Sequence, residues 1–147
     1  MEGNDIAPTL TSSVAVMFEG LIRIEEPAAQ KKWYQRSRKE DLTKDHIIRK
    51  WRPLELPLKS LLHMVNQLHQ NVEVYTYFPS EYVDDIETWL FRKGVSVTVI
   101  SYDDLEALKD DFKYNRDVHT LYTPFHEDVP WLGPRAYVMA PDRTWGF

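Results

Sequence analysis

The stretch from Asn71 to Ser101 constrains the fold of this chain more than any other, because it has the pattern of a strand, a helix and a second strand. Apolar and polar residues alternate from Val72 onward, which is typical of a half-buried strand. Ser80 is the predicted N-cap of the helix, and Gly94 is its predicted C-terminal stop. The β-branched run at residues 95–100 predicts the second strand. Because a helix separates the two strands, we predict a parallel pair with a right-handed crossover.

The rest of the chain alternates strands and helices in the same way. The segment Val14–Ile22 begins with a continuous apolar run, which predicts a central strand, buried on both faces, that Gly20 ends. The first further predicted helix spans about residues 41–51 and has Trp51 on its apolar face. A second helix is predicted at 58–70, after a connector enclosed by Pro53 and Pro57, and a third at 105–112, after a cap at Ser101 or Asp103. Two further strands are predicted at Val118–Tyr122 and Arg135–Met139. This alternation predicts a three-layer α/β/α sandwich around a mainly parallel five-stranded sheet.

Length and composition limit the classes of protein to consider. A chain of 147 residues is expected to form one domain, here residues 14–147 after a loose arm at 1–13. It has no cysteine, which excludes disulfides, thiolate metal sites and a cysteine nucleophile. The first residues lack the pattern of a signal peptide, and no apolar run reaches the roughly 20 residues that span a bilayer, so we expect a cytoplasmic protein that does not enter the membrane. The net charge of −5 argues against broad, charge-driven binding to nucleic acid.

Ligands of open parallel sheets bind beyond the carboxyl ends of the strands. The residues predicted at that rim are Met17 to Gly20, Thr76 to Pro79, Ser101 to Asp103 and Thr123 to Asp128. Any chemistry of this chain is therefore expected there.

The order of motifs along these strand ends resembles the haloacid dehalogenase-like (HAD) superfamily, and the chain looks like a small capless member, a kind common in bacteria and their phages. The resemblance covers about residues 14–139 and places VAVMFEGLI at the family's first motif. It puts Met17 at the nucleophilic aspartate, Glu19 at the acid/base aspartate, Gly20 at the glycine, Thr76 at the second motif's hydroxyl, Thr123 at the first acid of the fourth motif and Glu127 and Asp128 near the second acid. Lys109 and Lys113 are the nearby candidates for the third motif's lysine.

The departures from the family's pattern decide the expected chemistry. Methionine has no nucleophilic oxygen and is no ligand for a hard cation such as Mg²⁺, so Met17 removes the covalent route. We therefore expect a pseudo-phosphatase with degenerate motif positions and no cofactor. The alternative is a divergent Mg²⁺-dependent phosphatase that uses Glu19, Thr76 and Asp128. Glu127 is a further weak metal candidate, and these acids are otherwise solvated rim residues. Thr76 is expected either to bond a backbone group or to bind an anion.

A second candidate site lies in the predicted flap at residues 23–57. Its basic cluster carries aromatic residues between the charges and consists of Lys31, Lys32, Trp33, Tyr34, Arg36 and Arg38, followed by Lys39. Such a pattern suits phosphate backbones and base stacking, but it also suits a protein partner or a solvated flap. In the tail, Trp145 and Phe147 are either a docking element or core aromatics. The five histidines form no zinc pattern.

The expected function is that of a catalytically inactive HAD-like binding or assembly module. A protein partner or a homo-oligomer is the expected partner. The alternatives are the divergent phosphatase or nucleotidase and a nucleic-acid-binding accessory protein that uses the basic cluster.

Overall fold

The computed structural model describes residues 13–24, 43–115, 118–128, 130 and 135–145. Five parallel strands form the main sheet in the spatial order β5-β4-β1-β6-β7. They are β1 (Ser13–Met17), β4 (Val72–Thr76), β5 (Thr98–Ser101), β6 (Val118–Thr123) and β7 (Ala136–Val138). The predicted α/β class and five-stranded parallel sheet are confirmed, and the arrangement is compatible with a Rossmann-like fold.

Strand β1 lies in the centre of the sheet, and after Ser13 its residues are apolar without interruption. All of its residues are buried, as expected for a strand that is covered on both faces. It pairs with β4 on one side and with β6 on the other. The chain therefore builds one half of the sheet through β4 and β5 and then crosses to build the other half through β6 and β7. The point where the strand order reverses lies at β1, which is where open α/β sheets bind ligands.

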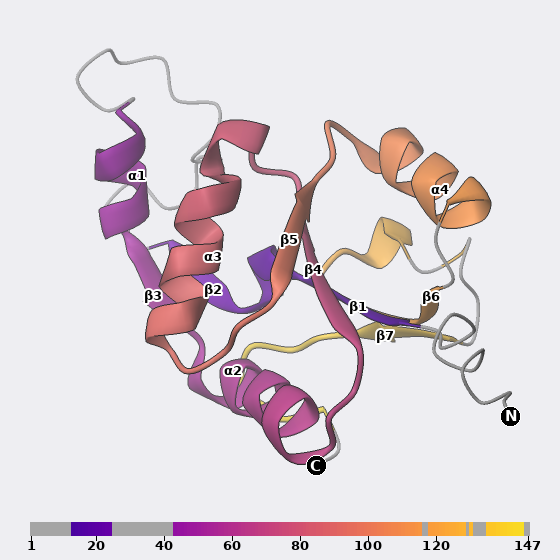
Figure 1. Ribbon diagram of the computed structural model, residues 1–147, viewed down its shortest axis with the longest axis horizontal. Helices are drawn as coiled ribbons and strands as arrows, with labels where there is room; N and C mark the ends of the chain where they lie inside the picture. Colours follow the sequence, from indigo (N-terminus) through magenta and orange to yellow (C-terminus); the bar gives the residue numbers. More distant parts are fainter. Residues whose placement is uncertain (1–12, 25–42, 116–117, 129, 131–134, 146–147) are drawn as a thin grey trace, which may run out of the picture.

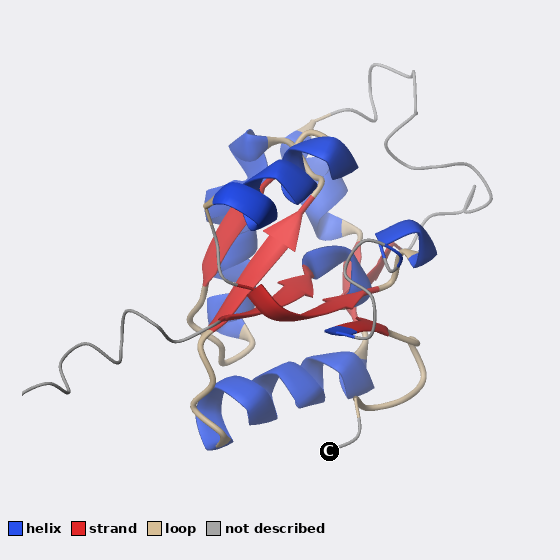
Figure 2. Cartoon of the chain, turned by 90° about the vertical axis from the view of Figure 1, so that its right-hand side faces the viewer, coloured by secondary structure: helices blue, strands red, loops and turns tan. Residues whose placement is uncertain are grey.

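The helices lie around this sheet. In both views α4 (Leu105–Tyr114) lies above the strands and α2 (Glu55–Leu62) lies below them (Figures 1 and 2). Helix α2 continues into a π-helical turn at His63–Gln67. Helix α3 (Val83–Arg92) connects β4 to β5, and the short α1 (Lys44–Arg49) lies beside it. None of the helices in the described ranges has the length and apolar character that a membrane span requires.

The β4–α3–β5 unit has the order of strand, helix and parallel strand that the sequence predicts. Asp84 and Asp85 lie in the first turn of α3, where the helix dipole favours acids, and Arg92 lies in the last turn. Gly94 follows with a φ of 103°, a left-handed conformation that costs a residue with a Cβ atom about 1–2 kcal/mol. This conformation lets the Val95 amide donate to the Leu90 carbonyl over 3.0 Å and turns the chain toward the parallel strand β5.

A small two-stranded sheet lies outside the main sheet. We call it the hairpin, although residues 25–50 separate its two strands in the sequence. Strands β2 (Ile22–Ile24) and β3 (Trp51–Pro53) pair in antiparallel fashion. The ring of Trp51 is buried and lies 5.0 Å from Phe18 and 5.2 Å from Phe78, measured between ring centroids. These edge-to-face contacts hold the hairpin beside the carboxyl ends of β1 and β4.

The hairpin corrects two predictions made from the first apolar run. The first strand, which the sequence predicts to run from Val14 until Gly20 ends it, in fact ends at Met17, and a single 3-10 turn at Phe18–Gly20 separates it from β2. Ser13, assigned to the loose arm, is buried and begins β1. In this turn the Phe18 ring packs against Trp51. Gly20 passes close to Met139 and Pro124, where a Cβ atom would not fit without movement.

The boundaries of the next elements also differ from the prediction. Trp51, predicted on the apolar face of a helix at 41–51, belongs to β3, and α1 ends at Arg49. The pairing of Trp51 with Ile24 is a contact between distant parts of the chain, which helical periodicity does not register. The predicted connector between Pro53 and Pro57 is wrong as well, because α2 begins at Glu55. Proline is tolerated in a first helical turn, where backbone amides have no intrahelical acceptor.

The predicted helix caps are wrong in detail. Ser80 begins a 3-10 turn at Ser80–Tyr82, and the N-cap position of α3 is occupied by Tyr82. Asp104 caps α4 by accepting a hydrogen bond of 2.9 Å from the Ala107 amide, in place of Ser101 or Asp103. The Ser101 hydroxyl instead donates to the Phe78 carbonyl over 2.6 Å. Strand β5 begins at Thr98, three positions later than the β-branched run suggested.

The structure also decides between the two roles that the sequence leaves open for Trp145. Its indole is buried and stacks on Tyr122, with ring centroids 4.6 Å apart. Its amide donates a hydrogen bond of 3.0 Å to the hydroxyl of Ser60 on α2. Trp145 is therefore a core residue, whereas Phe147 and the arm at residues 1–12 lie outside the described residues.

Candidate functional site

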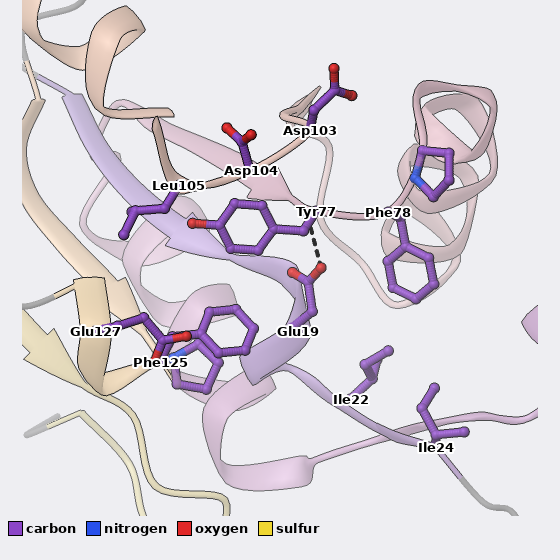
Figure 3. Close-up of a pocket in the computed structure, with 12 residues that line it drawn as sticks. Glu19, Ile22, Ile24, Tyr77, Phe78, Asp103, Asp104, Leu105, Phe125 and Glu127 are labelled. Carbon is purple, nitrogen blue, oxygen red and sulfur yellow. Dashed lines mark hydrogen bonds between the residues drawn. The ribbon is translucent and has the colours of Figure 1, made fainter. Parts of the chain in front are cut away.

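A pocket of about 570 Å³ lies at the carboxyl edge of the main sheet. Its lining comes from the segments that follow β1, β4, β5 and β6 and from strand β2 of the hairpin, as Figure 3 shows. The lining residues are Glu19, Ile22, Ile24, Tyr77, Phe78, Pro79, Asp103, Asp104, Leu105, Pro124, Phe125 and Glu127. We call this cavity the rim pocket. Its position matches the edge at which the sequence analysis expected a site.

Glu19 is the most firmly held side chain of the rim pocket. It extends from the 3-10 turn after β1, and its Oε2 atom accepts hydrogen bonds of 2.9 Å from the Thr76 hydroxyl and 2.8 Å from the Tyr77 amide. The dashed line in Figure 3 marks the bond from Tyr77. Two donors on one oxygen fix the carboxylate and stabilise its negative charge.

The two threonines at strand ends have similar structural tasks. The hydroxyl oxygen of Thr76 accepts the Phe78 amide over 3.0 Å, and that of Thr123 accepts the Phe125 amide over 3.0 Å. Each hydroxyl thus closes a turn two residues further on, directly after β4 and β6. Both side chains are fully buried and neither lines the rim pocket. Of the two roles expected for Thr76, the structure displays the backbone hydrogen bond.

Aromatic and aliphatic side chains form the walls between the acids. The rings of Tyr77 and Phe125 lie 5.6 Å apart at an angle of 46°. Figure 3 places the Tyr77 ring in the middle of the site, with Asp104 on one side and Glu19 and Phe125 on the other. Ile22 and Ile24 of β2 add an aliphatic wall. The pocket therefore combines a mainly apolar surface with a few charged groups, as is usual for sites that bind small molecules.

The structure separates the residues that the family resemblance singled out. Glu19 and Glu127 both line the rim pocket, whereas Met17 is fully buried at the end of β1 and does not. Asp128 ends the 3-10 turn at His126–Asp128, and its side chain is outside what the structure describes.

The two lysines considered for the third motif do not contribute to this site. On α4, Lys109 forms an ion pair of 3.5 Å with Glu106, and Lys113 lies over the Tyr114 ring; neither lysine lines the rim pocket. The basic cluster from Lys31 to Arg38 lies outside the described residues, so its role as a binding surface stays a prediction.

Within the described parts of the chain, no group of three or more histidine, aspartate or glutamate side chains is placed to hold a metal ion. The acids of the rim pocket come from separate segments and line different parts of a wide cavity. This geometry does not support a Mg²⁺ site built from the described carboxylates.

The sequence does not predict the contribution of β2 or of the two residues that follow the predicted range Ser101 to Asp103. Ile22 and Ile24 enter the site only because β2 pairs with β3, and no local pattern predicts that pairing. Asp104 and Leu105 follow the predicted range Ser101 to Asp103, because β5 and the cap of α4 both lie later than expected. The helix cap at Asp104 was the signal available in the sequence.

Comparisons of this chain with protein-family models, with curated proteins and with solved structures found no match. The function is therefore inferred from the geometry of the rim pocket and from the sequence.

Proposed function

We propose that this chain is a non-catalytic binding module with a HAD-like, three-layer plan, and that the rim pocket is its binding site. Three strand ends support the plan. Met17, Thr76 and Thr123, which the resemblance assigned to the family's first, second and fourth motifs, are the last residues of β1, β4 and β6. These strands are neighbours in the sheet, so the three positions meet at one edge.

The observation that carries the proposal is the burial of Met17. A covalent phosphoryl transfer needs a carboxylate that faces the substrate, and the position that resembles the nucleophile holds a fully buried thioether that does not line the pocket. The 3-10 turn and the β2–β3 hairpin follow β1, as a flap follows the first strand in the family that the chain resembles. In this proposal the chain keeps the HAD-like arrangement of elements but lacks the nucleophile of covalent phosphoryl transfer at Met17.

The rim pocket also disfavours the divergent phosphatase. A phosphate would face the carboxylates of Glu19, Asp103, Asp104 and Glu127, and none of the lining residues that the structure describes is basic. The Thr76 hydroxyl already donates its hydrogen to Glu19, so an anion that accepts from this hydroxyl would have to displace the carboxylate.

The expected partners outside the pocket remain predictions. A protein partner or a second copy of the chain is proposed to bind the basic cluster from Lys31 to Arg38, whose charge contrasts with the acidic whole. The nucleic-acid alternative uses the same residues and predicts binding that falls steeply with salt.

We predict that the protein has no Mg²⁺-dependent phosphatase activity. Hydrolysis of aryl phosphates and nucleotides should stay at background with millimolar Mg²⁺, because the two-step route lacks its nucleophile. The measurement is a phosphate-release assay of the wild type beside Glu19→Gln. Metal-dependent turnover that Glu19→Gln abolishes would refute the proposal.

The Met17→Asp variant serves as the control for this assay. No group of acidic side chains in the described residues is placed to hold a metal ion that could stabilise an aspartate at this buried position. The variant should therefore lose very roughly 1–3 kcal/mol of unfolding free energy and gain no activity. Met17→Leu keeps the volume and polarity of the site and should lose less than about 1.5 kcal/mol. Turnover in Met17→Asp would contradict the expectation that the remaining groups do not form a working site.

A further inference from the structure

Among the described residues that line the rim pocket, all the charged side chains are acidic. Carboxylates reach it from three segments that are distant in sequence: Glu19 after β1, Asp103 and Asp104 after β5, and Glu127 after β6. No lysine, arginine or histidine is among the described residues that line it. A cavity with such walls attracts cations and repels anions.

The positions of these carboxylates argue against a single metal ion as the occupant. A metal ion needs several ligands within about 2.0–2.6 Å, which requires their oxygens to converge on one point. No three acidic or histidine side chains in the described ranges converge in this way. A cation that meets these acids must therefore be larger than a metal ion and reach them at separate places.

The surface between the acids is suited to hydrocarbon. Ile22 and Ile24 form one wall, and Phe78, Leu105 and Phe125 contribute others. The Tyr77 and Phe125 rings lie side by side within the pocket, and aromatic faces attract ammonium groups as well as aliphatic chains. A ligand that alternates charge with methylene groups matches this lining.

Glu19 provides a fixed point for one charge. Its carboxylate is oriented before any ligand binds, because the Thr76 hydroxyl and the Tyr77 amide both donate to Oε2. Asp103, Asp104 and Glu127 are exposed, so their attraction for a ligand is screened by salt more strongly. A ligand is thus expected to anchor one ammonium near Glu19 and to extend another toward the exposed acids.

We propose that the rim pocket binds a linear aliphatic polyamine, whose ammonium groups meet the separated carboxylates while its methylene chain lies on the apolar walls. This inference rests on the proposed function, because it assumes that the pocket binds and does not hydrolyse.

The test is isothermal titration of the full chain with four probes: spermidine, 1-butylamine, 1-butanol and inorganic phosphate. Spermidine should bind with a stoichiometry of one and at least about tenfold more tightly than butylamine, because it makes additional charge-assisted contacts. Butanol and phosphate should give no saturable heat. Spermidine affinity should fall when NaCl rises from about 50 to about 500 mM, as expected for exposed charges.

Matched variants distinguish the pocket from the acidic surface in general. Glu127→Gln removes one charge in the rim pocket, and Asp110→Asn removes one from an exposed position on α4 outside it. Glu127→Gln should weaken spermidine binding about tenfold, and Asp110→Asn by less than about twofold. Phe125→Ala should weaken spermidine binding while leaving the net charge unchanged.

Equal losses in Glu127→Gln and Asp110→Asn would refute the inference, since they would indicate attraction to the surface alone. If butanol or phosphate bound saturably and as tightly as spermidine, the inference that the pocket selects a cationic ligand would be wrong. If spermidine fails to bind while phosphatase activity stays at background, the polyamine inference is wrong and the non-catalytic module stands. If Mg²⁺-dependent turnover appears, the proposed function itself is wrong.

Discussion

The ring of Tyr122 on β6 packs against aromatic rings from β7 and from the C-terminal segment. It lies on β6, stacks on Trp145 at 4.6 Å and contacts Tyr137 of β7 at 5.2 Å. Burial raises the pKa of the Tyr122 hydroxyl above its ordinary value, and the neighbouring Tyr137 raises it further. Burial likewise raises the pKa of Tyr82, beside the aromatic cluster of Trp51. The folded state therefore favours the neutral form of both tyrosines.

Because the pKa of both tyrosines is higher in the folded than in the unfolded state, the protein should lose stability at alkaline pH. Near pH 8 both tyrosines are neutral in the folded and unfolded states, so they add no pH dependence. Above about pH 10 the unfolded chain ionises while the folded chain resists, so the free energy of unfolding should fall with pH. Urea unfolding at several values between about pH 8 and 11 measures this slope.

Tyr122→Phe keeps the ring stack and removes the ionisable hydroxyl, so it should flatten the alkaline slope. Tyr114→Phe is the matched control at an exposed ring on α4 and should leave the slope unchanged. A Tyr122→Phe variant with the slope of the wild type would contradict the role of burial at this residue.

At the scale of elements, the free edge of β5 is closed by a side chain of α3. The Tyr102 amide donates to Thr76 of β4, so the amide of Val99, three residues earlier, points toward the open edge. That amide donates a hydrogen bond of 3.0 Å to Oε2 of Glu87. Because unpaired edge amides invite pairing with other strands, Glu87 both stabilises β5 and protects it.

We predict that Glu87→Ala lowers the free energy of unfolding by about 1–2 kcal/mol, because the Val99 amide loses a charged acceptor. Glu87→Gln keeps an acceptor and should lose less. Thr88→Ala, at the exposed neighbouring position, is the control for the helix itself. Chemical denaturation measures the three variants, and a Glu87→Ala variant as stable as Thr88→Ala would show that the hydrogen bond contributes nothing.

The same scale explains which elements the sequence predicts well. The unit from Val72 to Ser101 was predictable because each of its signals is local: alternation in β4, acids in the first turn of α3, and Gly94 at its end. The β2–β3 hairpin was not predictable, since Ile24 and Trp51 are brought together by a long intervening segment and by aromatic burial. Contacts of this kind depend on the whole core and leave no periodic pattern.

For the whole molecule, the position of the site was predictable and its lining only partly. Parallel strands bring their carboxyl ends to one edge, so Glu19, Tyr77 and Glu127 were expected near one another before any coordinates. The hydrogen bond between Glu19 and Thr76 was not predictable, because it depends on the 3-10 turn that replaces the end of the predicted first strand. The basic cluster from Lys31 to Arg38 remains a prediction from sequence.

The central claim is that the rim pocket is a binding site that selects cations over phosphate. The amide of Tyr77 is its most direct reporter, because it donates to the Glu19 carboxylate inside the pocket. In ¹⁵N-resolved NMR spectra, spermidine should shift the amide signals of Tyr77, Phe78 and Phe125 in a saturable way, and inorganic phosphate should leave them in place. Shifts of these amides by phosphate, with none by spermidine, would contradict the account.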